Sequence, residues 1–265
     1  MCLAVIALCV HPRYPLVVAA NRDEYHARAA TPAAWGETPP WQRILAGRDL
    51  AAGGTWFGVN RDGRFALVTN VRANGDQQPG SQSRGGIVPQ VLGTDIAPSR
   101  ALTALDAQRE RYAGVNVLAG SPTGAAWWSN RADGVRTMTT GVHGLSNAAL
   151  DTPWPKVMRA TDALRTWAST GDADSAPLFA MLLNRDPVPD AALPSTGLSP
   201  ERERLLATPF IVDARYGTRC TTVLTIDHAG ELRFHERTFA PDGSAVGDAI
   251  HVYATNQVTS ATVIR

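Results

Sequence analysis

The chain has 265 residues, of which 44% are hydrophobic, 18% charged and 7% aromatic, and its formal net charge is +1. These values are typical of a folded globular protein. A near-neutral balance lacks the basic footprint that nucleic acid or an anionic membrane surface requires, so we expect a small-molecule partner and no nucleic acid. Residues 3–10 are apolar but too few to cross a bilayer, so we expect no membrane span.

Three cysteines are present, and two of them, Cys2 and Cys9, lie seven residues apart. On one strand this spacing puts them on opposite faces, where they cannot pair. An odd cysteine count without the basic leader and cleavage site of an export signal indicates a reducing compartment. We therefore expect a cytoplasmic protein.

The chain opens with a predicted hairpin. Residues 3–9 and 16–20 are apolar and rich in strand formers, and residues 11–15 between them have turn chemistry. A second hairpin is predicted over residues 55–70, with Asp-Gly in its turn. The intervening residues 31–41, which contain proline and tryptophan, are predicted to form a loop.

The middle of the chain alternates between helical and strand patterns. Residues 72–85 are polar and glycine-rich, and we expect them to form a poorly ordered loop beside the functional site. Helices are predicted at residues 86–92 and 98–107. Four short strands follow, at residues 115–119, 125–129, 135–139 and 142–145.

The second half of the chain is predicted to add two helices and further strands. Apolar positions at helical intervals follow Pro155, and a second helix is predicted at residues 177–183. Residues 184–209 are rich in proline and charge and contain no predicted element. The closing strands are predicted at residues 210–213, 218–226, 231–238 and 249–254. Without a linker or repeat, this order predicts one α+β domain over residues 1–265, built of two mostly antiparallel sheets flanked by helices.

Met1-Cys2 is the first candidate for chemistry. Initiator methionine is normally removed before a small residue, which would leave Cys2 with a free α-amine and a thiol. These groups titrate at about 8 and about 8.5, so the neutral amine can take the thiol proton and replace the histidine of a triad. The alternative is that Cys2 is only a small residue before a buried strand.

Four polar residues follow the second strand abruptly: Asn21, Arg22, Asp23 and Glu24. A hairpin turn near residues 11–15 pairs residues whose numbers sum to about 26, which places Cys2 opposite a residue near Glu24. The four side chains are therefore predicted to lie within reach of Cys2. The alternative is an ion-paired turn that caps the strand.

Three later residues are further candidates. Asn70 ends a predicted strand and Asn147 precedes a predicted helix, and either amide could donate to a developing oxyanion or act as an ordinary cap. Arg219 borders an apolar strand and needs an anionic partner, for which Asp23 or Glu24 is available. The chain contains no phosphate-binding loop, dinucleotide fingerprint, H-E-x-x-H or C-x-x-C motif, so metal and nucleotide chemistry are disfavoured and no cofactor is expected.

These motifs resemble, in order, those of the NRDE, or transport and Golgi organisation 2, family. They are Met1-Cys2, Ala20 to Glu24, Gly53 to Gly58, Thr69-Asn70, Arg84-Gly85, Gly144 to Asn147, Thr152 to Trp154, Tyr216 to Arg219 and Glu236-Arg237. The resemblance implies a branch of the N-terminal nucleophile hydrolases, similar to bile salt hydrolases and penicillin V acylases. It therefore implies a four-layer αββα sandwich and an amidohydrolase of small linear amides.

The resemblance also implies roles for particular residues. The catalytic set is Cys2, Arg22, Asp23, Asn70, Asn147 and Arg219, and the expected substrate-binding residues are Asn21, Glu24, Trp56 and Arg84. The similar enzymes space arginine and aspartate three residues apart, whereas Arg22 and Asp23 are adjacent, which leaves open whether Asp23 or Glu24 orients the amine. A haem- or lipid-binding trafficking protein, including one that binds acyl-CoA, is the alternative implied by the family, with Cys2 or a histidine as a possible iron ligand.

Overall fold

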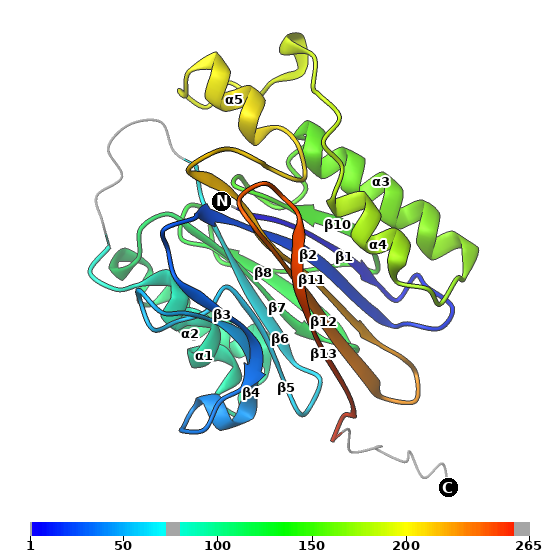
Figure 1. The fold of residues 1–265 in the computed structure, drawn as a ribbon. Helices are drawn as coiled ribbons and strands as arrows, with labels where there is room; N and C mark the ends of the chain where they lie inside the picture. Colours follow the sequence, from blue (N-terminus) through cyan, green and yellow to red (C-terminus); the bar gives the residue numbers. More distant parts are fainter. Residues whose placement is uncertain (1, 73–79, 257–265) are drawn as a thin grey trace, which may run out of the picture.

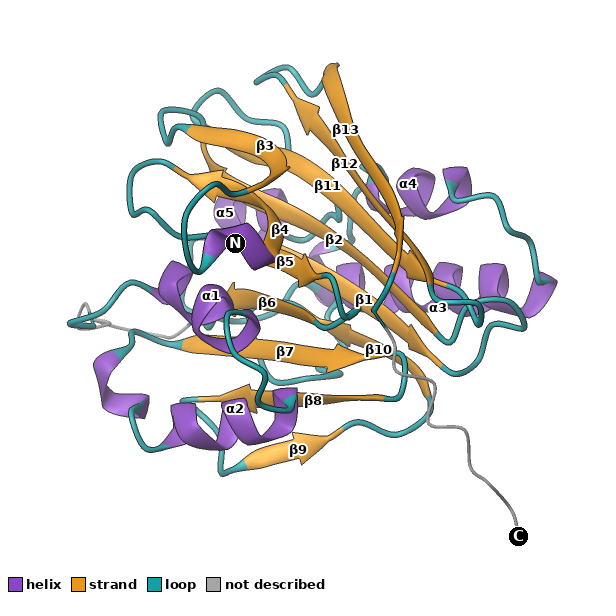
Figure 2. Cartoon of the chain, turned by 90° about the horizontal axis from the view of Figure 1, so that it is seen from below, coloured by secondary structure: helices purple, strands orange, loops and turns teal. Residues whose placement is uncertain are grey.

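The computed structural model describes residues 2–72 and 80–256 of the chain, and residues 73–79 of the predicted polar loop lie outside this part. Two antiparallel sheets pack face to face and carry helices on both outer faces (Figures 1 and 2). The predicted four-layer α+β sandwich is therefore confirmed. Among the described residues, no helix is both long and apolar enough to span a bilayer.

The first sheet contains the first and the last strand, and its strand order is β10-β1-β2-β11-β12-β13. Its strands are β1 (Cys2–Leu8), β2 (Leu16–Tyr25), β10 (Gly141–Leu145), β11 (Tyr216–Ile226), β12 (Glu231–Phe239) and β13 (Ala245–Ala254). β1 and β2 form the predicted N-terminal hairpin, and β2 lies between β1 and β11. The end of β2 is thus central in the sheet.

The second sheet is a meander in which each strand pairs with the next one along the chain. Its strands are β3 (Ala30–Trp35), β4 (Ile44–Asp49), β5 (Phe57–Asn60), β6 (Phe65–Asn70), β7 (Val115–Ser121), β8 (Gly124–Ser129) and β9 (Val135–Thr137). Its neighbouring strands are also neighbours in the sequence, although α1 and α2 lie in the connection between β6 and β7.

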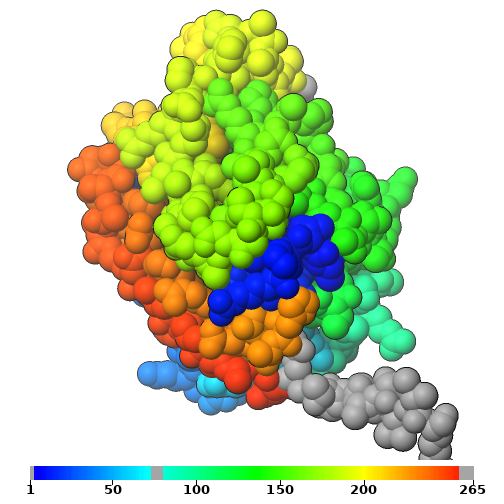
Figure 3. Space-filling view, turned by 90° about the vertical axis from the view of Figure 1, so that its right-hand side faces the viewer, coloured from blue at the N-terminus to red at the C-terminus, as the bar shows by residue number. Residues whose placement is uncertain are grey.

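Two pairs of helices form the outer layers. α1 (Ile87–Leu92) and α2 (Pro98–Asp106) pack on the second sheet, and α3 (Pro155–Thr170) and α4 (Ala176–Leu182) pack on the first. A short helix, α5 (Pro200–Leu206), precedes β11, and 3-10 turns occur at Trp41–Arg43, Arg84–Gly86, Arg109–Arg111 and Asp190–Ala192. In Figure 3 the yellow-green surface of the α3 and α4 region lies beside the blue turn between β1 and β2.

The central strands of the first sheet, β1, β2 and β11, are buried on both faces, which explains their largely apolar sequences. In β1, Ala4, Ile6 and Leu8 enter the core between the sheets. The alternate residues Leu3, Val5 and Ala7 pack under α3 and α4. Polar residues in such a strand must therefore find partners either between the sheets or under the helices.

The structure differs from the predicted secondary structure in four segments. The predicted loop at residues 31–41 contains most of β3. The register of β3 shifts between Thr31 and Ala34, so its side chains do not follow the alternation of apolar and polar residues that would have indicated a strand. The next strand, β4, was not predicted at all. Residues 210–213 form only an isolated bridge, between Val212 and Gly217. The stretch 184–209 contains α5, which is capped by the hydroxyl of Ser199.

We expect Phe234→Ala to lower the free energy of unfolding by about 3–5 kcal/mol, because it leaves a cavity between the sheets. Phe234 is 0% exposed, and its ring centroid lies 5.4 Å from that of Phe57 in the other sheet. Urea denaturation measures the loss. Val252→Ala, at a 50% exposed position on β13, is the control and should change stability by less than about 0.5 kcal/mol. Similar losses in both variants would contradict the packing described here.

Candidate active site

The four polar residues from Asn21 to Glu24 lie within β2 rather than after it. Arg22 is directly opposite Cys2 of β1 on one side and Cys220 of β11 on the other. The register confirms that the hairpin brings this segment to Cys2, but the facing residue is Arg22, two positions before Glu24. The thiol of Cys2 lies outside the described part of the structure.

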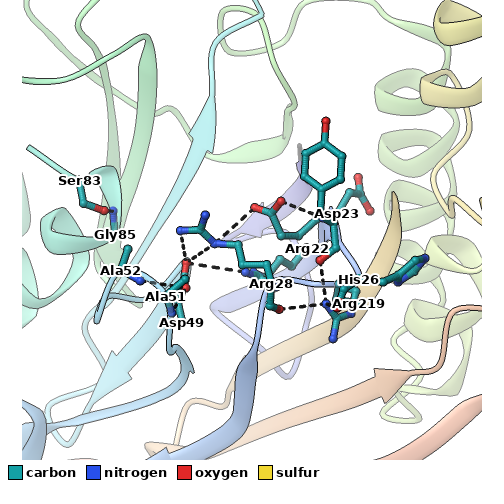
Figure 4. Close-up of polar contacts among 12 residues, drawn as sticks. Arg22, Asp23, His26, Arg28, Asp49, Ala51, Ala52, Ser83, Gly85 and Arg219 are labelled. Atoms are coloured by element: carbon teal, nitrogen blue, oxygen red, sulfur yellow. Dashed lines mark hydrogen bonds and ion pairs between the residues drawn. The ribbon is translucent and has the colours of Figure 1, made fainter. Parts of the chain in front are cut away.

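Arg22 enters the space between the sheets. Its side chain is only 5% exposed; Nη2 lies 3.8 Å from Oδ2 of Asp49, and the guanidinium stacks 4.3 Å from the ring of Trp56 (Figure 4 shows Arg22 and Asp49). Nη1 is buried and has no hydrogen-bond acceptor among the described residues. A buried cationic donor without an acceptor favours a ligand or intermediate that supplies one.

Asp49 is the main counter-ion on the second sheet. It accepts hydrogen bonds from Arg28 Nε at 2.8 Å and from the backbone amides of Ala51 and Ala52, and Arg28 Nη2 lies 2.7 Å from its Oδ2 (Figure 4). Burial alone would raise the pKa of Asp49, but the bond from Arg28 and the two amides hold it below its usual value. Asp49 is therefore a fixed carboxylate.

Asp23 points to the opposite side of β2, toward the helices. Its Oδ1 accepts a 2.7 Å hydrogen bond from the hydroxyl of Thr218. Burial raises the pKa of Asp23, and the positive charge of Lys156, at the start of α3, opposes that rise. Lys156 is itself only 1% exposed. Adjacent residues of β2 thus serve two layers of the molecule, because successive side chains of a strand alternate between its faces.

Two pockets meet at Arg22 and Trp56, which line both. We call the first the charged pocket; it has a volume of about 120 Å³ and is lined by Arg22, Asp23, Glu24, Arg28, Asp49, Thr55, Trp56, Val68, Asn70, Ser83, Arg84 and Gly85. The other, the second pocket, has a volume of about 210 Å³ and is lined by Arg22, Ala30, Thr31, Pro32, Trp56, Arg219, Cys220, Glu236, Thr238, Phe239 and Val246.

A close backbone approach closes one side of the charged pocket. A side chain on Gly54 would collide with the carbonyl of Gly85, and the amide of Thr55 donates to that carbonyl at 3.1 Å. Only glycine permits this contact, which holds the Arg84–Gly86 turn against β5 and places Arg84 at the pocket.

Glu236 connects the second pocket to the joint between the two sheets. Its Oε1 accepts the amide of Ala33 in β3 at 2.8 Å, and its Oε2 accepts the hydroxyl of Thr222 at 3.2 Å. Burial raises the pKa of this carboxyl, and these hydrogen bonds oppose the rise. Because the register of β3 is irregular at Ala33, the backbone amide of this residue has no acceptor in β4, and Glu236 supplies one.

The structure brings most of the predicted site residues together. Arg22, Asp23, Glu24, Trp56, Asn70 and Arg84 line the charged pocket. Arg219 lines the second pocket, but the expected ion pair with Asp23 or Glu24 is not formed. Its Nη1 instead donates to the carbonyls of Tyr25, His26 and Arg28, because the chain turns around the guanidinium after β2 (Figure 4).

Two predicted residues lie outside both pockets. Nδ2 of Asn21 donates to the carbonyls of Leu182 and Pro209, and its Oδ1 accepts from Thr221, so these contacts anchor the helical layer. Nδ2 of Asn147 donates to the carbonyl of Asn70 at 2.7 Å. Asn147 joins the ends of β10 and β6, and these contacts do not support the expected oxyanion role.

Sequence reasoning missed Asp49 and Lys156, and it gave Glu236 only as part of the Glu236-Arg237 motif, without a role. Asp49 and Glu236 reach the site from distant strands. Lys156 had a signal, since it is the single lysine among 25 basic residues. Within residues 2–72 and 80–256, no three side chains of His, Cys, Asp or Glu are grouped as a metal site requires.

Comparison with known proteins identifies the family. The model of the family described as Transport and Golgi organisation 2 matches residues 1–241. The chain belongs to this family. The bovine (Bos taurus) Transport and Golgi organization protein 2 homolog is 32% identical over 246 residues, which cover 85% of this chain and 87% of the relative. The human (Homo sapiens) homolog is 31% identical over 245 residues with the same coverage.

Solved structures resemble the chain in fold. A variant of conjugated bile acid hydrolase from Clostridium perfringens has a TM-score of 0.51 and 11% identity, covering 99% of this chain and 100% of that chain. A Caenorhabditis elegans ortholog of N-acylethanolamine-hydrolyzing acid amidase has a TM-score of 0.50 and 12% identity, covering 84% and 92%. This family member thus has the fold of the N-terminal nucleophile hydrolases.

We expect Glu236→Gln to become more stable relative to the native protein as the pH rises. The folded pKa of Glu236 lies above its unfolded value, so its favourable contribution is complete below the unfolded pKa, at about 4, and is lost as the pH rises through the folded pKa. Glutamine can still accept from Ala33. Urea denaturation from pH 4 to pH 8 measures the difference, which isolates Glu236 because Asp23 is present in both proteins.

Glu231→Gln is the matched control, at the exposed start of the same strand. Its stability difference from the native protein should stay constant over this range. If the difference in free energy of unfolding between Glu236→Gln and the native protein also stayed constant with pH, ionisation of the buried carboxyl would not destabilise the fold, and the prediction would be wrong.

Proposed function

We propose that the chain is a cytoplasmic amidohydrolase whose nucleophile is Cys2 as the first residue of the mature protein. The observation that carries the proposal is the register of β1, β2 and β11, which puts position 2 in one row with Arg22 at the junction of two pockets. The fold shared with N-terminal nucleophile hydrolases supports it. In the described part of the chain, neither Cys9 nor Cys220 forms a disulfide, which is in keeping with a reducing compartment.

The proposed reaction has two steps. The α-amine of Cys2 takes the thiol proton, and the thiolate attacks the amide carbonyl to form a C–S bond. Collapse of the tetrahedral intermediate breaks the C–N bond, and the protonated amine returns the proton to the departing nitrogen. Water, activated by the same amine, then hydrolyses the thioester and releases the carboxylic acid.

The described residues have separate tasks in this proposal. Arg22 stabilises the thiolate with its positive charge, which lowers the pKa of an adjacent thiol. Asp23 orients and polarises the α-amine from the helix side of β2, with Lys156 favouring its ionised form. We assign the side-chain amide of Asn70 as the donor that stabilises the oxyanion. The backbone of Asn70 is held in place by Asn147, which donates to its carbonyl.

We expect a form that keeps Met1 to lose amidase activity at least a hundredfold relative to the form that begins at Cys2. An acylated nitrogen has no basic lone pair and cannot take the thiol proton. Both forms are prepared with Cys9→Ser, because Cys9 is exposed and would react with a thiol probe. Intact mass confirms each N-terminus, and a panel of N-acyl amides with a thiol-directed probe reports activity and thiolate reactivity.

Cys2→Ser in the processed form controls for labelling at other positions. Equal turnover and equal labelling in the forms with and without Met1 would overturn the proposed mechanism. A relative is named for transport and Golgi organization, and a carrier is the competing function. Stoichiometric binding of haemin or an acyl chain, unaffected by Met1 and without turnover of any amide, would establish the carrier instead.

A further inference from the structure

We infer that the substrate is an N-acyl amino acid whose free carboxylate occupies the charged pocket and whose compact acyl group occupies the second pocket. This inference rests on the proposed function and adds the class of substrate to it. Three features of the described residues carry it: the charge balance of the charged pocket, the different walls of the two pockets, and two buried donors at their junction.

The charged pocket is lined by three arginines and three carboxylates. The charge of one of these carboxylates, Asp23, is opposed by Lys156 on the helix side of β2. Arg28 is already bound to Asp49 through two nitrogens. A ligand carboxylate in this pocket would therefore meet Arg22 and Arg84 with a favourable local charge.

Arg84 is the residue that we assign to the carboxylate. It lies on the turn that packs against Gly54, and its Nη1 donates to the carbonyl of Gly114 at 3.1 Å, so the side chain is held in place. A guanidinium has five donors in a fixed plane, and its geometry matches a carboxylate. Arg22 is paired with Cys2 in the neighbouring strand, so we assign its side chain to the reacting centre and not to the ligand carboxylate.

The second pocket has a different character. Ala30, Pro32, Phe239 and Val246 contribute apolar wall. Of its charged residues, Arg219 is bound to three carbonyls, and burial raises the pKa of Glu236 and so favours its neutral form. With a volume of about 210 Å³, it is smaller than ligand pockets usually are, at roughly 300 Å³ or more. A short or medium acyl chain suits it better than a long chain or a ring system.

The junction of the pockets lacks hydrogen-bond acceptors. Nη1 of Arg22 and Nε1 of Trp56 are both buried without a partner among the described residues, and both atoms can only donate. The two side chains stack on each other and line both pockets. An amide that spans the junction would bring its carbonyl oxygen to this pair and to the side chain of Asn70, which lines the charged pocket, with the acyl carbon on one side and the amine half on the other.

The test compares N-octanoylglycine with N-octanoylglycinamide, which differ in charge and hardly in shape. With the chain that begins at Cys2, we expect kcat/KM to be at least tenfold higher for the glycine compound, mainly through a lower KM. Arg84→Gln should remove most of this preference, because kcat/KM for N-octanoylglycine should fall toward the value for N-octanoylglycinamide. Turnover of both compounds without a preference, or a preference that Arg84→Gln leaves intact, would overturn the inference and leave the proposed function standing.

The acyl half is tested with acetyl, octanoyl and hexadecanoyl glycine. We expect octanoyl to be the best substrate, and Val246→Trp to reduce its kcat/KM at least fivefold more than that of the acetyl compound. Ile250→Trp is the matched control, since Ile250 is 49% exposed on the same strand and lines neither pocket. Equal rates for all three chain lengths would overturn the assignment of the second pocket.

Binding separates this inference from the proposed function. In Cys2→Ala, calorimetry with the glycine and glycinamide compounds reports the chemistry of the pockets without turnover. Preferred binding of the glycine compound by a chain that hydrolyses no amide would support the ligand class and overturn the hydrolase. Binding of neither compound, in a protein that does hydrolyse other amides, would overturn the ligand class alone.

Discussion

The burial of Arg22 between the two sheets is the constraint on which the site depends. A guanidinium stays charged inside a protein, so it needs counter-charge or a polarisable partner to remain buried. Asp49 and Trp56 supply these from the second sheet, at 3.8 Å and 4.3 Å. The apolar core between the sheets therefore ends at Arg22, and the two pockets lie where it ends.

The alternation of side chains along β2 distributes the functions of four adjacent residues. Asn21 and Asp23 face the helices, where Asn21 holds α4 and Asp23 meets Thr218 and the charge of Lys156. Arg22 faces the other sheet and Glu24 lines the charged pocket. One short polar segment thus joins the inner and outer layers of the sandwich, and each position has surroundings that its neighbour does not share.

The sequence predicted the fold and the central segment of the site well, because both depend on local patterns. Apolar runs and a turn defined the hairpin, and counting across that turn brought Cys2 to the polar end of β2. The register was two positions off because the turn closes with Cys9 donating to the carbonyl of Pro15, which pairs Cys2 with Arg22.

The remaining site residues could not be predicted because their positions depend on contacts between distant strands. A carboxylate such as Asp49 or Glu236 has no local pattern that says it will reach the space between the sheets. The contacts that Asn21 and Asn147 make could not be predicted for a related reason. Residue type predicts that an amide will form hydrogen bonds, but the partners are decided by the layer that it faces, and here both amides hold the fold together.

Lys156 shows how composition can carry information that a motif does not. In a chain with one lysine and 24 arginines, a lysine at the start of α3 departs from a strong preference for arginine. A compact ammonium concentrates its charge at one point, whereas a guanidinium spreads it over a plane with five donors. Burial raises the pKa of Asp23 and the charge of Lys156 lowers it, so the ionisation of this carboxyl depends on the balance between them. In the proposed mechanism Asp23 orients the α-amine of Cys2, and it can do so only as a carboxylate. Lys156 favours the carboxylate form from the helix side of β2, and in this way it contributes to the position of the amine that takes the thiol proton.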